Sequence, residues 1–581
     1  MSDFDEQVDF VIVGSGGGSM CAALVLRAAG RKVLILEKTA WVGGTTARSG
    51  GVMWLPDNPF MRRDGVADSF ERASSYLESL LGQQTDAPGS TPERRRRYLE
   101  AAPQMIDFLL AQGIQLDRVK EWPDYYDELP GGSVPGRTVV AKLFDLNELG
   151  EWAPRLRPSF VQMPLPATLE EMLELPALKR SWRVKWLLLK LVGRALVARL
   201  TGRRWVAAGA ALQGRMLQAA LKAGVEIRTE VPVGSLLEEG SRIAGVRFLQ
   251  DGQPRTVGAR LGVLVNAGGF ARNQAMRDRY IPGTSVQWSM AAPGDTGEMI
   301  EEMMRVGAAV AQMEERVGTQ VTLPPGSEDS EIKPTAQAMT AAPHCILVDS
   351  GGHRYLNEGG SYMAYTKAML ARHATTPAVP SWAIFDAQYL SKSMLAGTLP
   401  GRRKPPRWTQ EGWLRRAQDL PTLAKLLNID ADTLVATVTR FNGFVDRGRD
   451  EDFHRGERAY DRWLGDELHR PHPSLGRIEQ APFYAVPVYP GDVGTYGGVV
   501  TDVHARVLRG DGSVIEGLYA TGVSTASVMG RFYPGAGSSV GPSFVWGYVA
   551  GQHAASSATS ATAATQAAVR NVGESAGQLL G

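Results

Sequence analysis

The sequence predicts an α/β protein with a parallel sheet, because three widely separated segments share one form. Each is a short run of mostly branched apolar residues that ends at glycine, which is typical of a strand buried on both faces. They are residues 8–13, 261–269 and 514–522. At 581 residues the chain exceeds a single hydrophobic core. We therefore expect these strands to share one sheet while another domain interrupts the sequence.

The first of these strands opens a strand–helix–strand unit. Small and apolar residues recur at helical spacing over residues 19–31, and residues 32–36 form a second buried strand that ends at Glu37. The later elements of the same domain are a helix at residues 208–224, a strand at 225–227 and a hairpin of residues 243–248 with 257–260. This order indicates a discontinuous Rossmann-type domain.

A change of composition after about residue 281 predicts an inserted second domain of the α+β class. The first domain then comprises residues 1–285 and 488–555, and it carries a basic apolar insertion at about 140–205. The second domain spans residues 286–487. Residues 556–581 are mostly Ala, Ser, Thr, Gly and Gln, which bury too little apolar surface to offset the entropy of ordering, so a flexible tail is expected.

Composition and charge exclude several classes of protein. Apolar residues make up 44% of the chain and charged residues 21%, as in an ordinary globular protein. The formal net charge is only +2, so no global field would recruit nucleic acid. Cys21 and Cys345 are the two cysteines, which favours a reducing cytoplasm over a disulfide-based fold. Residues 1–8 lack a signal-peptide pattern, and no metal site is predicted.

A glycine-rich loop joins the first strand to its helix. In residues 14–19 (GSGGGS), glycines allow a tight turn that presents backbone N–H groups and a helix N-terminus to a pyrophosphate. Ser19 replaces the third glycine of the usual fingerprint. Glu37 follows at the end of the next strand, where a carboxylate accepts hydrogen bonds from ribose hydroxyls and repels a 2′-phosphate. The pair predicts a dinucleotide site.

The segment Gly43–Gly51 (GGTTARSGG) distinguishes the type of dinucleotide. It resembles a stretch that passes under the isoalloxazine ring in the flavoprotein family of fumarate reductases and 3-ketosteroid dehydrogenases. Residues 266–270, 294–297 and 517–522 follow in the family's order. The resemblance implies bound FAD, with Val231 or Val233 meeting the adenine through backbone groups. The implied FAD residues are Gly14, Ser15, Gly16, Gly17, Gly18, Glu37, Lys38, Gly43, Gly44, Thr45, Thr46, Ser49, Gly50, Gly51, Val233, Ala267, Gly268, Asp295, Gly522, Gly537, Ser539 and Val540.

The segment Tyr533–Gly537 (YPGAG) resembles that of the bacterial 3-ketosteroid Δ1-dehydrogenases within this family. A phenol with a pKa near 10 donates a hydrogen bond while neutral, and a glycine N–H beside it completes a two-donor site for a ketone oxygen. By the resemblance, Tyr362 removes the proton from steroid carbon 2 and Tyr125 hydrogen-bonds to this base. The neighbouring tyrosines at 126, 355 and 365 are alternatives for these two positions.

The implied reaction is the 1,2-desaturation of a 3-ketosteroid. Tyr533 and the Gly537 N–H polarise the ketone, Tyr362 takes the proton, and hydride passes from carbon 1 to the flavin, which an external, quinone-like acceptor reoxidises. Alternatives are a 4,5-desaturase, a fumarate-reductase-like enzyme and a non-catalytic flavin electron-transfer module. The histidine-rich stretch expected of a fumarate reductase before Gly497 is absent from the sequence, and Tyr496 stands where related desaturases usually have lysine.

The insertion contains an unusual basic and apolar stretch. Residues 179–204 include nine Lys and Arg and no acid, interleaved with leucines and with Trp182 and Trp186, and Trp205 follows. The frequency of charges excludes a membrane span. An interfacial helix, seated by tryptophans and cations on an anionic bilayer, is predicted through about residues 179–205. The protein would then be cytoplasmic and peripheral to the membrane; a helix packed on the body or on a subunit is the alternative.

Overall fold

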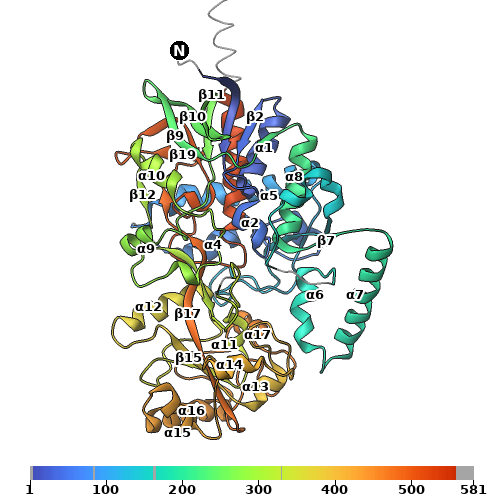
Figure 1. Ribbon diagram of the computed structural model, residues 1–581, viewed down its shortest axis with the longest axis vertical. Coiled ribbons are helices and arrows are strands. Elements are labelled where there is room, and N and C mark those ends of the chain that lie inside the picture. Colours follow the sequence, from blue (N-terminus) through green and yellow to red (C-terminus); the bar gives the residue numbers. More distant parts are fainter. Residues whose placement is uncertain (1–3, 83–85, 161–164, 329, 558–581) are drawn as a thin grey trace, which may run out of the picture.

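The computed structural model describes residues 4–82, 86–160, 165–328 and 330–557. The chain forms two joined bodies and one projecting helical arm (Figure 1). The predicted tail at 556–581 lies outside the described residues from 558 onward.

The upper body is built on an eight-stranded sheet, and it confirms the predicted Rossmann-type fold. Its central strand β1 (Glu6–Val13) pairs in parallel with β2 (Val33–Leu36) on one side and with β11 (Gln253–Val265) on the other. Beyond these lie β8 (Glu226–Arg228), parallel to β2, and β20 (Val514–Ala520), parallel to β11. The segments expected to meet across the sequence therefore do share one sheet, in the order β19-β20-β11-β1-β2-β8.

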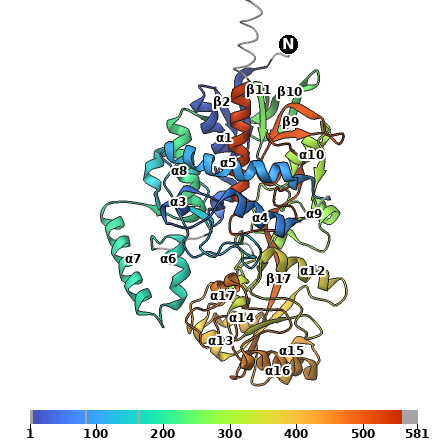
Figure 2. The same cartoon turned by 180° about the vertical axis from the view of Figure 1, so that it is seen from behind.

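Helices cover one face of this sheet, and the strands β9 (Val233–Glu239) and β10 (Arg242–Gln250) pack against the other. The helix α1 (Gly17–Ala28) follows β1 directly, and α8 (Ala208–Lys222) packs against it. A helix at residues 540–557 runs beside α1 (Figure 2). The predicted hairpin is present as β10 with the first half of β11, and β9 pairs with β10. At the edge of the main sheet, β19 (Arg506–Leu508) pairs with β20.

The lower body contains an antiparallel sheet with helices around it. Its longest strand is β17 (Phe483–Thr495), which pairs with β13 (Arg316–Val321), β15 (Ser381–Phe385) and β16 (Arg415–Ala417), and β14 (Cys345–Val348) pairs with β15. Because β17 runs without interruption through residue 487, it joins the lower body to the upper one. Its Val493 and Gly494 reach the wall of the large cleft described below.

The helical arm projects from the side of the upper body (Figures 1 and 2). It consists of α6 (Leu169–Glu174) and α7 (Trp182–Leu200), joined through η3 (Leu175–Ala177). The base of the arm is closed by a two-residue pairing of β6 (Phe144–Asp145) with β7 (Trp205–Val206). In the described part of the chain, no helix is long and apolar enough to cross a bilayer.

The remaining elements complete the two bodies. In the upper body and its junction with the lower one they are α2 (Gly44–Arg48), β3 (Val52–Trp54), α3 (Pro59–Arg63), α4 (Phe70–Leu81), η1 (Pro88–Ser90), α5 (Pro92–Ala111), β4 (Leu116–Arg118), β5 (Thr138–Ala141), η2 (Leu146–Arg155), α9 (Gln274–Tyr280), η4 (Val286–Trp288), α10 (Glu298–Arg305), β12 (Val310–Ala311), β18 (Gly498–Val499) and η5 (Gly522–Ser524). In the lower body they are α11 (Gln337–Ala341), α12 (Tyr362–His373), α13 (Ala387–Lys392), α14 (Pro406–Gln410), α15 (Leu420–Leu427), α16 (Ala431–Arg447) and α17 (Ala459–Leu464).

Candidate active site

A long cleft opens at the carboxyl ends of β1, β2 and β11, where ligands bind in open parallel sheets. The empty space within it, including the part open to solvent, is about 1260 Å³. Most of the residues predicted to hold a dinucleotide line it: Gly14, Ser15, Gly16, Glu37, Lys38, Gly44, Thr45, Thr46, Ser49, Val233, Ala267, Gly268, Asp295, Ser539 and Val540. The sequence motifs therefore converge on one cavity.

The glycines of the first loop divide into two groups. Gly14 has a positive φ of 90°, and a Cβ atom there would overlap the backbone of Asn266, so the tight turn requires glycine. Gly16 lies on the cavity wall with Asn266 as its near neighbour. Gly17 and Gly18 do not line the cavity: a Cβ atom on Gly17 would overlap the ring of Phe544. These two glycines allow α1 to approach the helix at 540–557.

Five other predicted residues also lie behind the cavity wall. Gly51 has a positive φ of 63° and is packed against the backbone at the start of α8, and Gly522 is packed against Asn266. Gly43, with a φ of 110°, turns the chain into α2, and its N–H donates to Ser15 Oγ at 3.0 Å. Gly50 and Gly537 are likewise absent from the wall. These positions shape the backbone that forms the cavity.

The Glu37 carboxylate is held in place by four hydrogen bonds. Oε2 accepts from the N–H and the hydroxyl of Ser15 at 3.1 and 2.6 Å. Oε1 accepts from the N–H and the hydroxyl of Thr39 at 2.9 and 2.8 Å. The carboxylate is thus fixed on the cavity wall as an acceptor. The Glu37 carbonyl accepts from the Val231 N–H at 2.9 Å, and both Val231 and Val233 line the cavity.

Asp295 carries a buried oxygen without a partner. Its Oδ1 accepts from the Gly269 N–H, and its Oδ2 has no hydrogen-bond partner among the described residues. Burial raises the pKa of Asp295 to about 6. Buried polar atoms are nearly always hydrogen-bonded in folded proteins. An unsatisfied oxygen on the cavity wall, together with glycines whose Cβ would fill the cradle, fits a bound polar cofactor such as FAD.

Sequence reasoning missed several residues of the wall. Arg157 is buried there, donates to Thr39 Oγ1 at 3.0 Å, and has its pKa lowered by burial. It lies in irregular chain after η2, where no periodic pattern or motif marks it. The other missed residues of the wall include Thr39, Asn266, Ala292, Gly294, Glu298, Met299, Val317, Val493, Gly494, Val523 and Ser543. Asn266, Gly294 and Ser543 lie inside or next to recognised motifs.

The three predicted catalytic tyrosines meet in one cluster. The ring centroids of Tyr125 and Tyr362 are 5.3 Å apart, those of Tyr362 and Tyr533 are 5.0 Å apart, and those of Tyr125 and Tyr533 are 5.9 Å apart. Tyr125 and Tyr533 are buried and Tyr362 is half-buried. They come from the chain between β4 and β5, the first turn of α12 and the loop before the 540–557 helix.

The loop that carries Tyr533 is tightly held. The Pro534 carbonyl accepts from the Tyr125 N–H at 2.9 Å and from the Tyr76 hydroxyl at 2.7 Å. Gly537 has a positive φ of 95°, and a Cβ atom there would overlap the Val52 carbonyl, so only glycine fits. The Tyr533 hydroxyl lies 3.1 Å from Ser539 Oγ. The same loop therefore fixes Tyr125 and Tyr533 against each other.

A buried ion pair supports Tyr125 from behind. Asp124 accepts from Trp54 Nε1 at 2.7 Å and from Arg137 at 2.8 Å, and Arg137 also pairs with Asp68. Burial raises the pKa of Asp124 to about 6, although the charge of Arg137 opposes the rise. Asp124, the residue before Tyr125, is thus held both by Trp54 of β3 and by Arg137.

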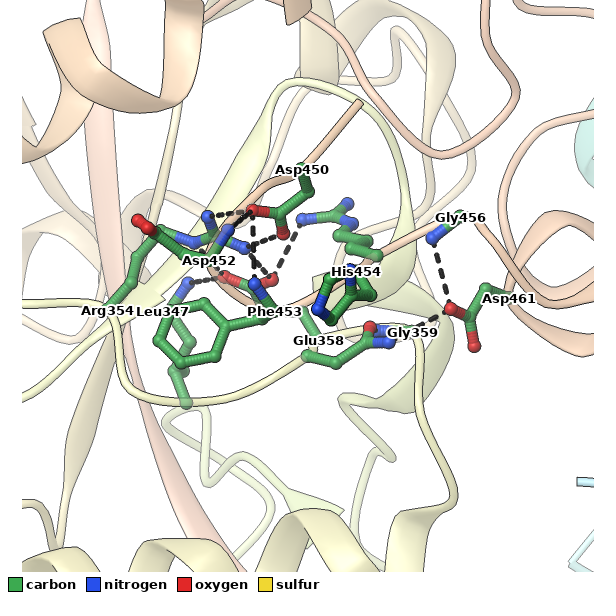
Figure 3. Close-up of polar contacts among 12 residues, drawn as sticks. Leu347, Arg354, Glu358, Gly359, Asp450, Asp452, Phe453, His454, Gly456 and Asp461 are labelled. Carbon is green, nitrogen blue, oxygen red and sulfur yellow. Dashed lines mark hydrogen bonds and ion pairs between the residues drawn. The ribbon is translucent and has the colours of Figure 1, made fainter. Parts of the chain in front are cut away.

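A second buried ion cluster anchors the loop that leads to Tyr362 (Figure 3). Glu358 accepts from Arg354 Nε and Nη2 at 2.9 and 2.7 Å and from the Leu347 N–H at 3.1 Å. Arg354 also pairs with Asp450 at 2.8 Å, and Arg455 lies 3.3 Å from Glu358. All four charged groups are buried or nearly so. Glu358 is four residues before Tyr362, so the cluster fixes the start of α12.

The other tyrosines take separate positions. The hydroxyls of Tyr355 and Ser381 are 2.6 Å apart, and both Tyr355 and Tyr365 belong to the apolar core of the lower body. Tyr126 packs its ring against Phe532. Tyr496 is buried 6.0 Å from the Tyr533 ring, and its hydroxyl donates to the Ser538 carbonyl at 3.0 Å. Tyr496 therefore supports the Tyr533 loop as a neutral group. Tyr460, which sequence reasoning did not single out, has its ring centroid 4.2 Å from that of Tyr125.

The buried tyrosine cluster disfavours the charged phenolate form of its members. Burial raises the pKa of Tyr125 and of Tyr362 well above the ordinary value, and neighbouring phenols add to the rise. Burial also raises the pKa of Tyr533, and hydrogen bonds from Ser539, Tyr362 and the Gly537 backbone oppose it. Tyr533 is consequently suited to donate a hydrogen bond as a neutral phenol, while a base at Tyr362 needs help from its neighbours.

The arm exposes the apolar side chains of α7. Trp182, Trp186 and Leu200 are each at least 70% exposed, and Leu189 and Leu196 are also exposed. Fewer of the nine cations of residues 179–204 are available to an anionic surface than the sequence suggested. Four of the nine pair with carboxylates: Arg180 with Asp466, Arg183 with Glu174, and Lys190 and Arg194 with Glu171. The exposed face is thus mainly apolar, with a partly neutralised cationic border.

The chain matches known proteins over nearly its whole length. The family model described as "FAD binding domain" matches residues 9–540. A 3-oxosteroid 1-dehydrogenase from Mycolicibacterium smegmatis is 37% identical over 94% of this chain and 96% of its own. A 4-oxocyclohexanecarboxylate 2-dehydrogenase from Sinomonas cyclohexanicum is 32% identical over 94% of this chain and 92% of its own.

A solved structure gives the corresponding result in three dimensions. It is a 3-ketosteroid delta1-dehydrogenase from Sterolibacterium denitrificans in complex with 1,4-androstadiene-3,17-dione. The match has a TM-score of 0.88 at 34% identity and covers 95% of this chain and all of that chain.

Proposed function

The chain belongs to the FAD-binding flavoprotein family that includes the 3-oxosteroid 1-dehydrogenases, and from that premise we propose that it catalyses FAD-dependent 1,2-desaturation of 3-ketosteroids. The observation that carries the proposal is the convergence of Tyr125, Tyr362 and Tyr533 next to a cavity that fits FAD. Each tyrosine alone is an ordinary core residue. A cluster of three, drawn from three segments, provides an acid–base pair and a ketone donor together.

The ketone oxygen is the first group to be recognised. The neutral Tyr533 phenol and the Gly537 N–H donate to it, and this withdraws electrons from carbon 2. The loop is rigid because Pro534 and Gly537 are held by Tyr125, Tyr76 and the neighbouring strand β3. Rigid donors need no reorganisation as charge develops on the oxygen, so they stabilise the enolate-like state.

The proton on carbon 2 passes to the oxygen of Tyr362. Burial raises the pKa of Tyr362 and so disfavours its charged form. A charged oxygen can only accept hydrogen bonds, and we propose that the Tyr125 hydroxyl then donates to it. When bound, FAD supplies the acceptor for the hydride that leaves carbon 1. Residues that we propose hold it include Gly14, Gly16, Glu37 and Asp295, whose positions on the cavity wall are described above.

We also propose that the arm attaches the enzyme to the cytoplasmic face of an anionic membrane. The exposed tryptophans and leucines of α7 support this, because amphipathic rings and apolar side chains seat a helix at the level of the lipid head groups. Steroids partition into the same layer. An apolar, quinone-like electron acceptor would also reside there, and we propose such an acceptor for flavin reoxidation.

An anaerobic titration with a 3-keto-4-ene steroid tests the function. The flavin's visible absorbance should bleach stoichiometrically, and the product should be the 1,4-diene. A saturated 3-ketosteroid converted to the 4-ene would indicate a 4,5-desaturase instead. Oxidation of a reduced flavin by fumarate would indicate the reductase, and no bleaching by any steroid would leave a non-catalytic electron-transfer module.

A further inference from the structure

Tyr460 makes the closest ring contact of the tyrosine cluster. It lies at the start of α17 and is fully buried, and its ring centroid is 4.2 Å from that of Tyr125, with the two rings tilted by 33°. Tyr125 is farther from its other two tyrosine neighbours, at 5.3 and 5.9 Å. The side chain of Tyr125 interacts with those of both Tyr460 and Tyr362, and each interaction affects the pKa values of the phenols. Tyr460 thus continues the line of phenols behind the base.

Once Tyr362 is charged, its oxygen can only accept hydrogen bonds. This fixes which group donates to which from Tyr460 through Tyr125 to Tyr362. Gln337 Nε2 donates to the Tyr460 hydroxyl oxygen at 2.6 Å. Each phenol has a single O–H to donate. Since Gln337 already serves the Tyr460 oxygen, the Tyr460 O–H is available to Tyr125, and the Tyr125 O–H is then available to the Tyr362 oxygen. Hydrogen bonds in such a chain polarise and strengthen one another.

The backbone around Tyr460 is tied to both segments that carry its partners. Asp127, two residues after Tyr125, accepts from the N–H groups of Ala459 and Tyr460 at 3.0 Å each. Asp461 accepts from Asn357 Nδ2 at 2.9 Å and from the Gly456 N–H at 3.0 Å (Figure 3). Asn357 belongs to the loop that leads to Tyr362. The start of α17 therefore sets the distance between the base and its hydrogen-bond donor.

We propose that Tyr460 is a positioning residue for proton abstraction, which acts through Tyr125 to stabilise the charged form of Tyr362. Gln337 orients its hydroxyl, and Asp127 and Asp461 fix its backbone. This proposal rests on the proposed function, because it assigns a role in the same reaction.

The test is Tyr460→Phe, which keeps the ring packed against Tyr125 and removes only the hydroxyl. Loss of a hydrogen bond that is relayed to a charged group should lower kcat about tenfold. The KM for the steroid should stay within about twofold of the wild-type value. The rising limb of the kcat–pH profile, which follows ionisation of Tyr362, should move to higher pH by about one unit. Tyr355→Phe is the matched control, because it removes a partly buried hydroxyl bonded to Ser381 elsewhere in the lower body and should change neither quantity.

A second readout is independent of turnover. 3-Fluorotyrosine at position 362 reports its own ionisation through the 19F signal as pH rises, and Tyr460→Phe should move that titration upward in the flavin-loaded protein. If the wild-type protein does not turn over steroid but Tyr460→Phe still shifts the 19F titration, the proposed function is wrong and the role of Tyr460 in stabilising charged Tyr362 is supported. If Tyr460→Phe loses flavin or fold, Gln337→Leu replaces it and should shift both readouts in the same direction by less. The proposal would be overturned if Tyr460→Phe and Tyr355→Phe gave the same kcat, pH profile and 19F titration.

Discussion

The ring of Tyr362 lies 5.0 Å from the ring of Tyr533, although one begins a helix of the lower body and the other belongs to a loop of the upper body. The group proposed to remove a proton and the group proposed to bind the ketone are therefore placed by different parts of the chain. Each part is held by its own buried ion pairs, through Arg354 and Glu358 on one side and Arg137 and Asp124 on the other.

Replacing either tyrosine should abolish turnover and leave the cofactor in place. We expect Tyr362→Phe and Tyr533→Phe to lower kcat by a factor of about 10² or more, the usual effect of removing an acid–base group or an oxyanion donor. Steady-state kinetics with flavin quantified by absorbance measures both. Tyr126→Phe is the control and should have less effect than Tyr125→Phe, since Tyr126 packs on Phe532. Near-normal turnover in both catalytic variants would show that the site is misplaced.

Substitutions of two neighbouring glycines in the first loop should affect different properties, flavin binding in one case and folding in the other. Gly16→Val should give a folded but colourless protein, because Gly16 lies on the cavity wall and the branched side chain would occupy the place of the pyrophosphate. Gly17→Val should lose the fold itself, because its side chain would overlap Phe544 in the protein core. Circular dichroism and flavin absorbance separate the two results. A fully yellow Gly16→Val protein would contradict the assignment.

Turnover should rise with pH well into the alkaline range. Burial raises the pKa of Tyr362 well above its ordinary value, so its phenolate form becomes more populated as pH increases. Below that pKa the phenolate fraction grows about tenfold per pH unit, and kcat should follow it if proton removal limits the rate. Stopped-flow flavin reduction across the pH range measures this step directly, with flavin retention as the control. A rate independent of pH would argue against a tyrosine base.

The arm should bind membranes chiefly through its apolar face. Replacing Trp182, Trp186 and Leu189 by serine should strongly reduce co-sedimentation with anionic vesicles and leave turnover on detergent-dissolved steroid intact. The salt dependence should be moderate, because four of the nine cations already pair with carboxylates and each free one adds only about 1 kcal/mol. Serine at the exposed Leu249, Leu426 and Leu468 is the matched control. Equal lack of binding to neutral and anionic vesicles at low salt would leave the arm as a contact for another protein.

The sequence was sufficient for the sheet because its signals are local. The runs at 8–13 and 32–36 and the strand ending at Val265 are apolar enough that only a buried parallel sheet can accommodate them, and they lie side by side as β1, β2 and β11. The glycine loop was located as well, yet the separate tasks of Gly16 and Gly17 were not predictable. That distinction depends on Phe544, more than 500 residues later in the chain.

The site was less predictable, since its residues carry no periodic signal. Tyr125, Tyr362 and Tyr533 were found through family resemblance, and nothing in their spacing indicates that they meet. Tyr460 and Arg157 have neither a motif nor a pattern around them. Their positions depend on long-range contacts, such as the bond from Tyr460 N–H to Asp127, which joins residues 333 apart. The pairing of four arm cations with acids was likewise hidden, because Glu171 and Glu174 precede the acid-free stretch and Asp466 is distant in sequence.

The strand β17 enters the upper body without a break, so the lower body is not a freely hinged attachment. Its far end carries the pairing with β15 and β16, and its near end reaches Val493 and Gly494 on the cavity wall. For protein engineering this has a practical meaning. A chimera that exchanges the lower body with that of a relative must keep the whole of β17 with one parent, because a splice at residue 487 would cut a continuous strand in its middle. A splice after Thr495 would transfer Tyr362 together with Val493 and Gly494 of the cavity wall.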